Sequence, residues 1–141
     1  MCIWDFNSAC DNYSHPVTEP QHFELQHNVW YYMLCKDEDF IETVISRYRE
    51  LRQGILSDQA LCDYMDAVAE WLGPAVERNF SVWGDTLDKS MLSPEERNPR
   101  SHGEALEQMK RFCRERGQWM DESIEILRQY SHISKNKKFN H

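Results

Sequence analysis

The sequence predicts an all-α fold, a bundle of four to five helices behind a loop-rich N-terminal arm, for three reasons. Apolar residues recur at three- and four-residue steps through most of residues 21–133. Capping residues, glycines and a proline interrupt this pattern where helices should begin and end. The one short strand that we expect, Cys2-Ile3-Trp4, has no partner run of alternating β-branched residues in the rest of the sequence.

The chain divides into three parts. Residues 1–20 form the arm, which is rich in Asn, Asp, Ser and Pro and therefore favours turns. Residues 21–133 form the helical bundle, and residues 134–141 are a short basic tail that we expect to be solvated.

Two helices are expected before residue 54. The first covers about residues 22–35, and the second begins after Asp37 as its N-cap and ends at Gly54. The apolar face of the second helix comprises Phe40, Ile41, Val44, Ile45, Tyr48 and Leu51. We expect its opposite face to be wet, and that face carries Glu42, Arg49, Glu50 and Arg52.

Ser57 should cap a third helix, which Gly73-Pro74 interrupts because proline lacks a backbone donor. Its predicted core stripe consists of Leu61, Met65, Val68, Ala69 and Leu72. A fourth helix then starts at Pro74 and runs to Gly84.

A loop over residues 84–100 contains a short capped turn at Ser93-Pro94-Glu95-Glu96. Ser101 and Glu104 then form a capping box that begins the longest helix. Gly117 inside that helix costs about 1 kcal/mol relative to alanine, and it would let a neighbouring chain come close. The core face of the helix comprises Leu106, Met109, Cys113, Met120, Ile124 and Leu127.

The charge balance argues against nucleic-acid partners. The formal net charge is −8 and the pI is about 5.2, whereas binding to phosphate backbones depends on clustered Lys and Arg. No apolar run is long enough for a membrane helix, and the first residues lack the apolar stretch of a signal peptide.

The five cysteines are scattered, odd in number and without a C-x-x-C pair. This pattern encodes neither a disulfide framework nor a zinc site, so a reducing compartment is the default. Cys35, Cys62 and Cys113 lie beside apolar positions of expected helices, where we expect them to pack as small hydrophobes.

Asp5 is the first candidate for chemistry because it stands between two large anchors, Trp4 and Phe6. A carboxylate fixed in this way suits Mg²⁺, which accepts little deviation from octahedral oxygen geometry. The alternative is an aspartate that caps a turn. His22 and His27 do not share a helical face well, and no phosphate loop, nucleophile elbow or H-E-x-x-H pair occurs.

Arginines next to aromatics either clamp an acidic partner or form salt bridges within the bundle, and we expect the second for most of them. Arg78-Asn79 should lie near the core because of its apolar neighbours. A tryptophan stripe is interpreted as core, or alternatively as a surface for a protein partner. The stripe comprises Trp30, Trp71, Trp83 and Trp119.

Five groups of residues, in this order, resemble the spore coat protein H (CotH) kinase-like family and span nearly the whole chain. They are Trp4-Asp5-Phe6-Asn7 with Asn12-Tyr13, Trp30-Tyr31-Tyr32-Met33-Leu34 ahead of Asp39-Phe40, Arg47-Tyr48-Arg49-Glu50-Leu51-Arg52, Arg78-Asn79-Phe80 with Trp83, and Arg116-Gly117 with Trp119-Met120-Asp121.

The resemblance implies an atypical protein kinase fold, of which these helices would complete the C-terminal lobe. It implies that Asp5 holds the Mg²⁺ that bridges ATP phosphates, while a Ser or Thr hydroxyl of a protein substrate accepts the phosphoryl group. Asn7 stands where many members of the family have a second aspartate, so it offers an oxygen without a charge. By resemblance the setting is a spore coat or cell envelope.

In this family the nucleotide-binding lobe and the catalytic loop should precede the Trp-Asp-Phe motif, and only three residues precede Trp4 here. We therefore expect a C-terminal piece of a longer kinase, inactive alone, whose partner is the missing N-terminal lobe. The alternative is a non-enzymatic helical module that binds a protein. If the piece lacks its lobe, Asp5 should lie on a poorly packed arm.

Overall fold

The fold is known from a computed structural model that describes residues 10, 12, 23, 29–84 and 87–131. All regular secondary structure in these residues is helical, which confirms the predicted all-α class. The arm over residues 1–20, including its expected strand, lies outside the described residues except for Cys10 and Asn12, and so does the tail over 134–141.

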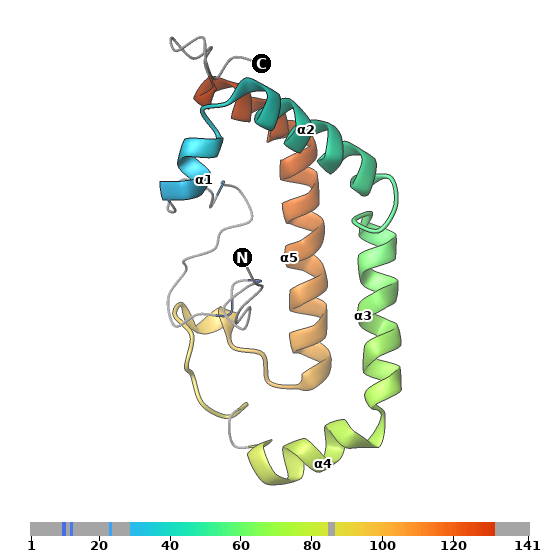
Figure 1. The fold of residues 1–141 in the computed structure, drawn as a ribbon. Helices are drawn as coiled ribbons and strands as arrows, with labels where there is room; N and C mark the ends of the chain where they lie inside the picture. The colour runs from blue at the N-terminus through green and yellow to red at the C-terminus, as the bar shows by residue number, and fades with distance from the viewer. Residues whose placement is uncertain (1–9, 11, 13–22, 24–28, 85–86, 132–141) are drawn as a thin grey trace.

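The helices follow one another with short connections, except between α4 and α5, where a longer loop contains η3 (Figure 1). They are α1 (Val29–Leu34), α2 (Glu38–Arg52), α3 (Asp58–Leu72), α4 (Pro74–Trp83), the 3₁₀ turn η3 (Glu95–Arg97), α5 (His102–Ser123) and the 3₁₀ helix η4 (Ile124–Tyr130). α3 runs alongside α5, and α2 packs on η4 at one end of that pair (Figure 1).

The predicted caps set three of the helix starts. Asp37 accepts a hydrogen bond from the backbone N–H of Phe40 at 2.7 Å and so caps α2. Ser57 caps α3 through the backbone N–H of Ala60 at 3.2 Å. Each cap satisfies a backbone donor that the first helical turn leaves without a partner.

The capping box at α5 closes in a modified form. Ser101 Oγ accepts from the backbone N–H of Glu104 at 3.1 Å. The Glu104 carboxylate accepts from the backbone N–H of Arg100 at 2.7 Å, one residue before the cap. The predicted cap at Ser93 is wrong, because η3 follows Pro94 and no side chain caps it. Asn98 ties this turn together instead, since it exchanges two hydrogen bonds of 2.8 Å with the backbone of Leu92.

The core lies where α2 meets η4. Among the described residues its buried apolar members are Cys35, Ile41, Ile45, Ile124 and Leu127. Phe23, Phe40, Val44, Tyr48, Met120 and Tyr130 pack against them. Burial of each large aliphatic side chain contributes roughly 1.5–3 kcal/mol, so this end carries most of the hydrophobic stabilisation.

The other end of the molecule is thinly packed. Neither α3 nor α4 has a buried residue, and the predicted core residues Val68 and Leu72 are exposed. α3 instead joins α5 partly through a polar link, in which the buried Lys110 ammonium donates to Asp66 at 2.5 Å and to Glu107 at 2.9 Å.

Candidate functional site

Arg52 is the centre of the best-defined polar cluster, at the point where α2, α3 and α5 meet. Its side chain is only 15% exposed, so the expectation that it lies on a wet face is wrong. Nε donates to both carboxylate oxygens of Asp121 on α5, at 3.0 and 2.9 Å. Nη1 donates to the carbonyl oxygen of Leu56 at 2.7 Å, which fixes the turn between α2 and α3.

Asp58, the first residue of α3, completes the neutralisation of Arg52. Its Oδ1 lies 2.7 Å from Arg52 Nη1. This buried oxygen meets no well-aligned donor, so the contact is an ion pair more than a hydrogen bond. Asp58 first, and then Asp121, raises the pKa of the guanidinium further, and Arg52 therefore stays charged.

Tyr48 lies one turn before Arg52 on the same face of α2. Its hydroxyl lies 2.8 Å from Asp121 Oδ1 and 3.2 Å from the carbonyl oxygen of Gly117, both of them acceptors. Burial, and then the hydrogen bond to the Asp121 carboxylate, raises the pKa of Tyr48, so the hydroxyl remains a donor.

Gly117 makes room for this arrangement. A Cβ at that position would lie 2.5 Å from Arg52 Nη2 and 2.9 Å from Asp58 Oδ1, distances that atoms in contact do not reach. The close approach predicted at this glycine is therefore made by the Arg52 side chain of α2, within the same chain.

The Arg52 cluster joins two of the segments that carry the family resemblance, one on α2 and one on α5. Its polar groups are engaged with one another, so it holds three helices in register and presents no reactive atom. In these two segments, the residues that resemble the family therefore serve to hold the helices of the bundle together. The sequence interpretation missed this cluster, because it put Tyr48 and Arg52 on opposite faces of the helix; the four-residue step between them is the signal that places them on one face.

The predicted metal ligands Asp5 and Asn7 lie outside the described residues, as do Trp4 and Phe6. The expectation of a poorly packed arm around Asp5 therefore stays a prediction. Within residues 29–84 and 87–131, together with residues 10, 12 and 23, no group of three His, Cys, Asp or Glu side chains is placed to hold a metal ion.

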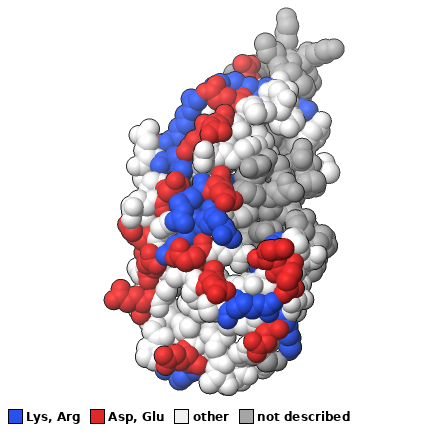
Figure 2. All heavy atoms as spheres, turned by 180° about the vertical axis from the view of Figure 1, so that it is seen from behind, with Lys and Arg blue, Asp and Glu red and all other residues white. Residues whose placement is uncertain are grey.

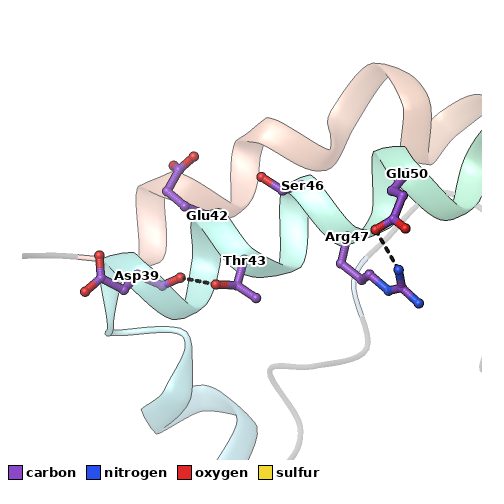
Figure 3. Close-up of a pocket in the computed structure, with 6 residues that line it drawn as sticks. All are labelled: Asp39, Glu42, Thr43, Ser46, Arg47 and Glu50. Atoms are coloured by element: carbon purple, nitrogen blue, oxygen red, sulfur yellow. Dashed lines mark hydrogen bonds and ion pairs between the residues drawn. The ribbon is translucent and has the colours of Figure 1, made fainter.

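A shallow hollow on the outer face of α2 is lined by six side chains (Figure 3). They are Asp39, Glu42, Thr43, Ser46, Arg47 and Glu50. All come from one helix, and their polar groups are partly used locally, as in the 2.6 Å ion pair of Arg47 with Glu50. Groups from a single helix face do not converge on a reacting atom.

Salt bridges account for several arginines, as predicted. Arg47 pairs with Glu50, and Arg49 on α2 pairs with Glu125 on η4. Figure 2 shows basic side chains lying beside acidic ones on the face that it draws. Arg78 and Asn79 are exposed on α4, so the prediction that this pair lies near the core is wrong. The thin packing around α4 is the reason.

The tryptophan stripe is not core for the most part. Trp30, Trp71 and Trp83 are 76%, 83% and 61% exposed. Trp119 alone of the four is half-buried, with its ring 4.8 Å from that of Phe23. These three exposed residues lie on three different helices, α1, α3 and α4.

No helix in the described part of the chain combines the length and the apolar character needed to cross a membrane.

A family model described as CotH kinase protein matches residues 1–120. No curated protein and no solved structure matches the chain. The matched range includes Asp5 and Asn7 and all of α2, α3 and α4, and it ends within α5, one residue before Asp121.

Proposed function

The chain belongs to the CotH kinase protein family, and from this premise we propose that it is the metal-binding and helical part of an atypical protein kinase. The activity would be ATP- and Mg²⁺-dependent transfer of a phosphoryl group to Ser or Thr in coat or envelope proteins. The observation that carries the proposal is the family match, which covers the Trp-Asp-Phe motif together with the helices from α1 through most of α5.

The chemistry of the donors fits magnesium. Asp5 offers carboxylate oxygens and Asn7 an amide oxygen, and Mg²⁺ prefers such hard oxygen ligands, usually one or two from protein with phosphates and waters completing the shell. When bound, the ion neutralises phosphate charge. The role of Asp5 is to hold that positive charge at a fixed point, and the helices serve as its support.

Turnover requires more than this support. Phosphoryl transfer depends on positioning and on charge stabilisation from several sides, and by resemblance the groups that grip the nucleotide belong to the lobe before the motif. We therefore propose that the chain binds metal by itself and turns over ATP only together with that lobe.

Metal titration tests the proposal directly. Mn²⁺ is a suitable stand-in for Mg²⁺ because its binding can be followed by electron paramagnetic resonance. We expect binding by the wild type with ATP present, loss of most of it in Asp5→Asn, and retention in Asp11→Asn, a nearby acid outside the motif. Circular dichroism confirms that each variant is folded.

Equal Mn²⁺ affinity in the wild type and in Asp5→Asn would reject the assignment of Asp5. Appreciable ATP turnover by this chain alone, abolished by Asp5→Ala, would instead reject the requirement for the lobe.

The exposure of Trp30, Trp71 and Trp83 favours a second candidate, a non-enzymatic helical module that binds a protein. The two candidates differ in the metal titration, because a binding module has no need of Asp5. They also differ in the effect of Trp71→Ala. In a binding module this substitution would weaken partner binding and leave the Mn²⁺ affinity unchanged.

A further inference from the structure

α3 carries two apolar faces, and only one of them is covered. The face toward α5 includes Leu61, Met65 and Ala69, which are half-buried. On another side of the same helix, Tyr64 and Trp71 are 71% and 83% exposed. Figure 1 shows α3 at the edge of the molecule, with α5 beside it. The second apolar face is therefore available to a partner.

The exposed face of α3 has the spacing of a contact between helices. Ala60, Tyr64, Ala67 and Trp71 follow one another at steps of four, three and four residues, which is the repeat of an a/d seam. Small and large side chains alternate along this seam, so each alanine leaves a gap into which a side chain of a partner helix can insert. Val68 is also exposed and widens the seam on one flank.

The size of the seam suits a small contact. Tyr64 and Trp71 are two helical turns apart, which is about 10.5 Å along the axis. A buried aromatic side chain covers about 150–250 Å², so these two side chains, exposed for the most part, offer roughly 250–400 Å². Specific interfaces bury about 800 Å² on each partner. We therefore expect affinity in the micromolar range.

The charge of α3 is uniformly negative. The helix contains four acidic residues and no lysine or arginine. Asp58 and Asp66 are engaged in ion pairs within the bundle. Asp63 and Glu70 are exposed and lie on one flank of the seam, seven residues apart. Within the described part of the chain, neither of these two carboxylates has a basic partner.

The end of α3 adds to this negative potential. Its last turn contains Glu70 and Trp71 and has no basic residue, and the carbonyl groups at a helix C-terminus carry a partial negative charge. The exposed ring of Trp71 can accept an arginine or a lysine through a cation–π contact. The whole chain has a formal net charge of −8, so its field attracts cationic segments and repels acidic ones.

We propose that the outer face of α3 binds an amphipathic, basic helix of another protein. Apolar side chains of that helix pack on Tyr64, Val68 and Trp71, and lysines or arginines seven residues apart pair with Asp63 and Glu70. The inference rests on the second candidate function, binding to a protein, and names the class of partner.

The acidic flank disfavours two other occupants of the face. An anionic membrane is repelled by Asp63 and Glu70. A second copy of the chain, packed with its α3 antiparallel to the first, places these two acids beside their own counterparts, and like charges in contact are unfavourable.

Two designed peptides test the surface on the full chain. The basic probe is a fluorescein-labelled helix about three heptads long, with leucine at the a and d positions and lysine at the e and g positions. The acidic probe has glutamate in place of lysine. Fluorescence anisotropy gives the Kd of each peptide. We expect micromolar binding of the basic probe that weakens with added salt, and binding of the acidic probe that is at least about tenfold weaker.

Variants locate the bound probe. Trp71→Ala should weaken binding of the basic probe about tenfold or more, because large aromatics supply most of the affinity of such contacts. Asp63→Asn combined with Glu70→Gln should weaken it severalfold and remove most of the salt dependence. The matched control is Glu115→Gln with Glu122→Gln, which neutralises two exposed acids, also seven residues apart, on α5. Circular dichroism confirms that each variant is folded.

Four results would overturn the proposal. They are the absence of saturable binding of the basic probe, and equal affinity for that probe in the wild type and in Trp71→Ala. The others are binding to vesicles of phosphatidylcholine with phosphatidylserine, or dimerisation in analytical ultracentrifugation, that Trp71→Ala abolishes; these would assign the face to a membrane or to a second copy.

The class of partner and the candidate functions have separate readouts. If both probes bind with equal affinity and Trp71→Ala weakens both, the basic partner is rejected while protein binding at α3 stands. The Mn²⁺ titration of Asp5→Asn is made without either peptide, so its outcome decides the metal site and leaves the peptide result unaffected.

Discussion

Gly117→Ala should destabilise the protein, although alanine is the better helix former. The added Cβ would lie 2.5 Å from Arg52 Nη2 and 2.7 Å from Arg52 Cζ. A normal contact needs about 3.5 Å, so the guanidinium must retreat by about 1 Å. That retreat breaks its contacts with Asp121, with Asp58 and with the carbonyl oxygen of Leu56.

The magnitude follows from those three partners. Hydrogen bonds to a charged group contribute about 1.5–3 kcal/mol, but Asp58 and Asp121 are each 43% exposed, so solvent screening reduces each to about 1 kcal/mol. The loss of three contacts is then about 3 kcal/mol. The gain in helix propensity is about 1 kcal/mol, which leaves a net destabilisation of about 2 kcal/mol.

Urea unfolding followed by far-UV circular dichroism measures the effect, with a lower midpoint and an unchanged slope expected. In an Arg52→Ala background the two guanidinium contacts are gone and only Asp58 Oδ1, at 2.9 Å, has to give way, so Gly117→Ala should destabilise by much less than in the wild type. Gly103→Ala is the matched control on α5, because its nearest contact would be an ordinary 3.9 Å from Ser101 Oγ. Stabilisation by Gly117→Ala in the wild type, or the same effect in both backgrounds, would refute the reasoning.

Three further predictions follow from packing and charge. The hydrogen bond from Arg128 lowers the pKa of Glu42, so the pair stabilises the fold above the ordinary glutamate pKa and is lost as pH falls through the lowered value. Urea midpoints of Glu42→Gln should therefore fall less on acidification than those of the wild type, and an equal fall would contradict this. Ile45 is fully buried, so Ile45→Ala should lower the free energy of unfolding by about 2–5 kcal/mol. Trp71 is 83% exposed, so Trp71→Ala should change that free energy by less than about 0.5 kcal/mol. Thermal denaturation that ranked the two variants otherwise would disprove the packing account. The neighbouring Cys113 thiol lowers the pKa of Cys10 to about 7, so alkylation of Cys10 by iodoacetamide should increase with pH around a midpoint near 7, and a midpoint near 9 would show an ordinary thiol.

Helix boundaries could be predicted from the sequence because they depend on neighbours along the chain. Asp37, Ser57 and Ser101 each cap a backbone N–H three residues ahead, and Gly73-Pro74 separates two helices through backbone geometry alone. These are local effects of a few residues, so they need no knowledge of tertiary packing.

The surroundings of Arg52 could not be predicted in the same way. Its partner Asp121 is 69 residues away, and on a helical wheel an arginine beside other charged residues is expected to face water. For Trp71 the error is the opposite one: core was predicted and the side chain is exposed. An apolar residue at helical spacing becomes core only where another element covers it. α3 meets α5 on one side, and Trp71 is 83% exposed.

The residues that carry the family resemblance thus fall into two groups with different experimental signatures. Tyr48, Arg52 and Asp121 hold helices together, so their substitution should lower stability and reduce any function only as a consequence of that loss. By the proposed function Asp5 instead holds the metal ion, so Asp5→Asn should remove most of the metal binding while it leaves the urea midpoint unchanged. An activity measurement on a variant of this protein is therefore informative about chemistry only when it is made beside a stability measurement on the same variant. A loss of metal binding that followed stability in both groups would mean that the metal site is a property of the folded bundle and not of Asp5.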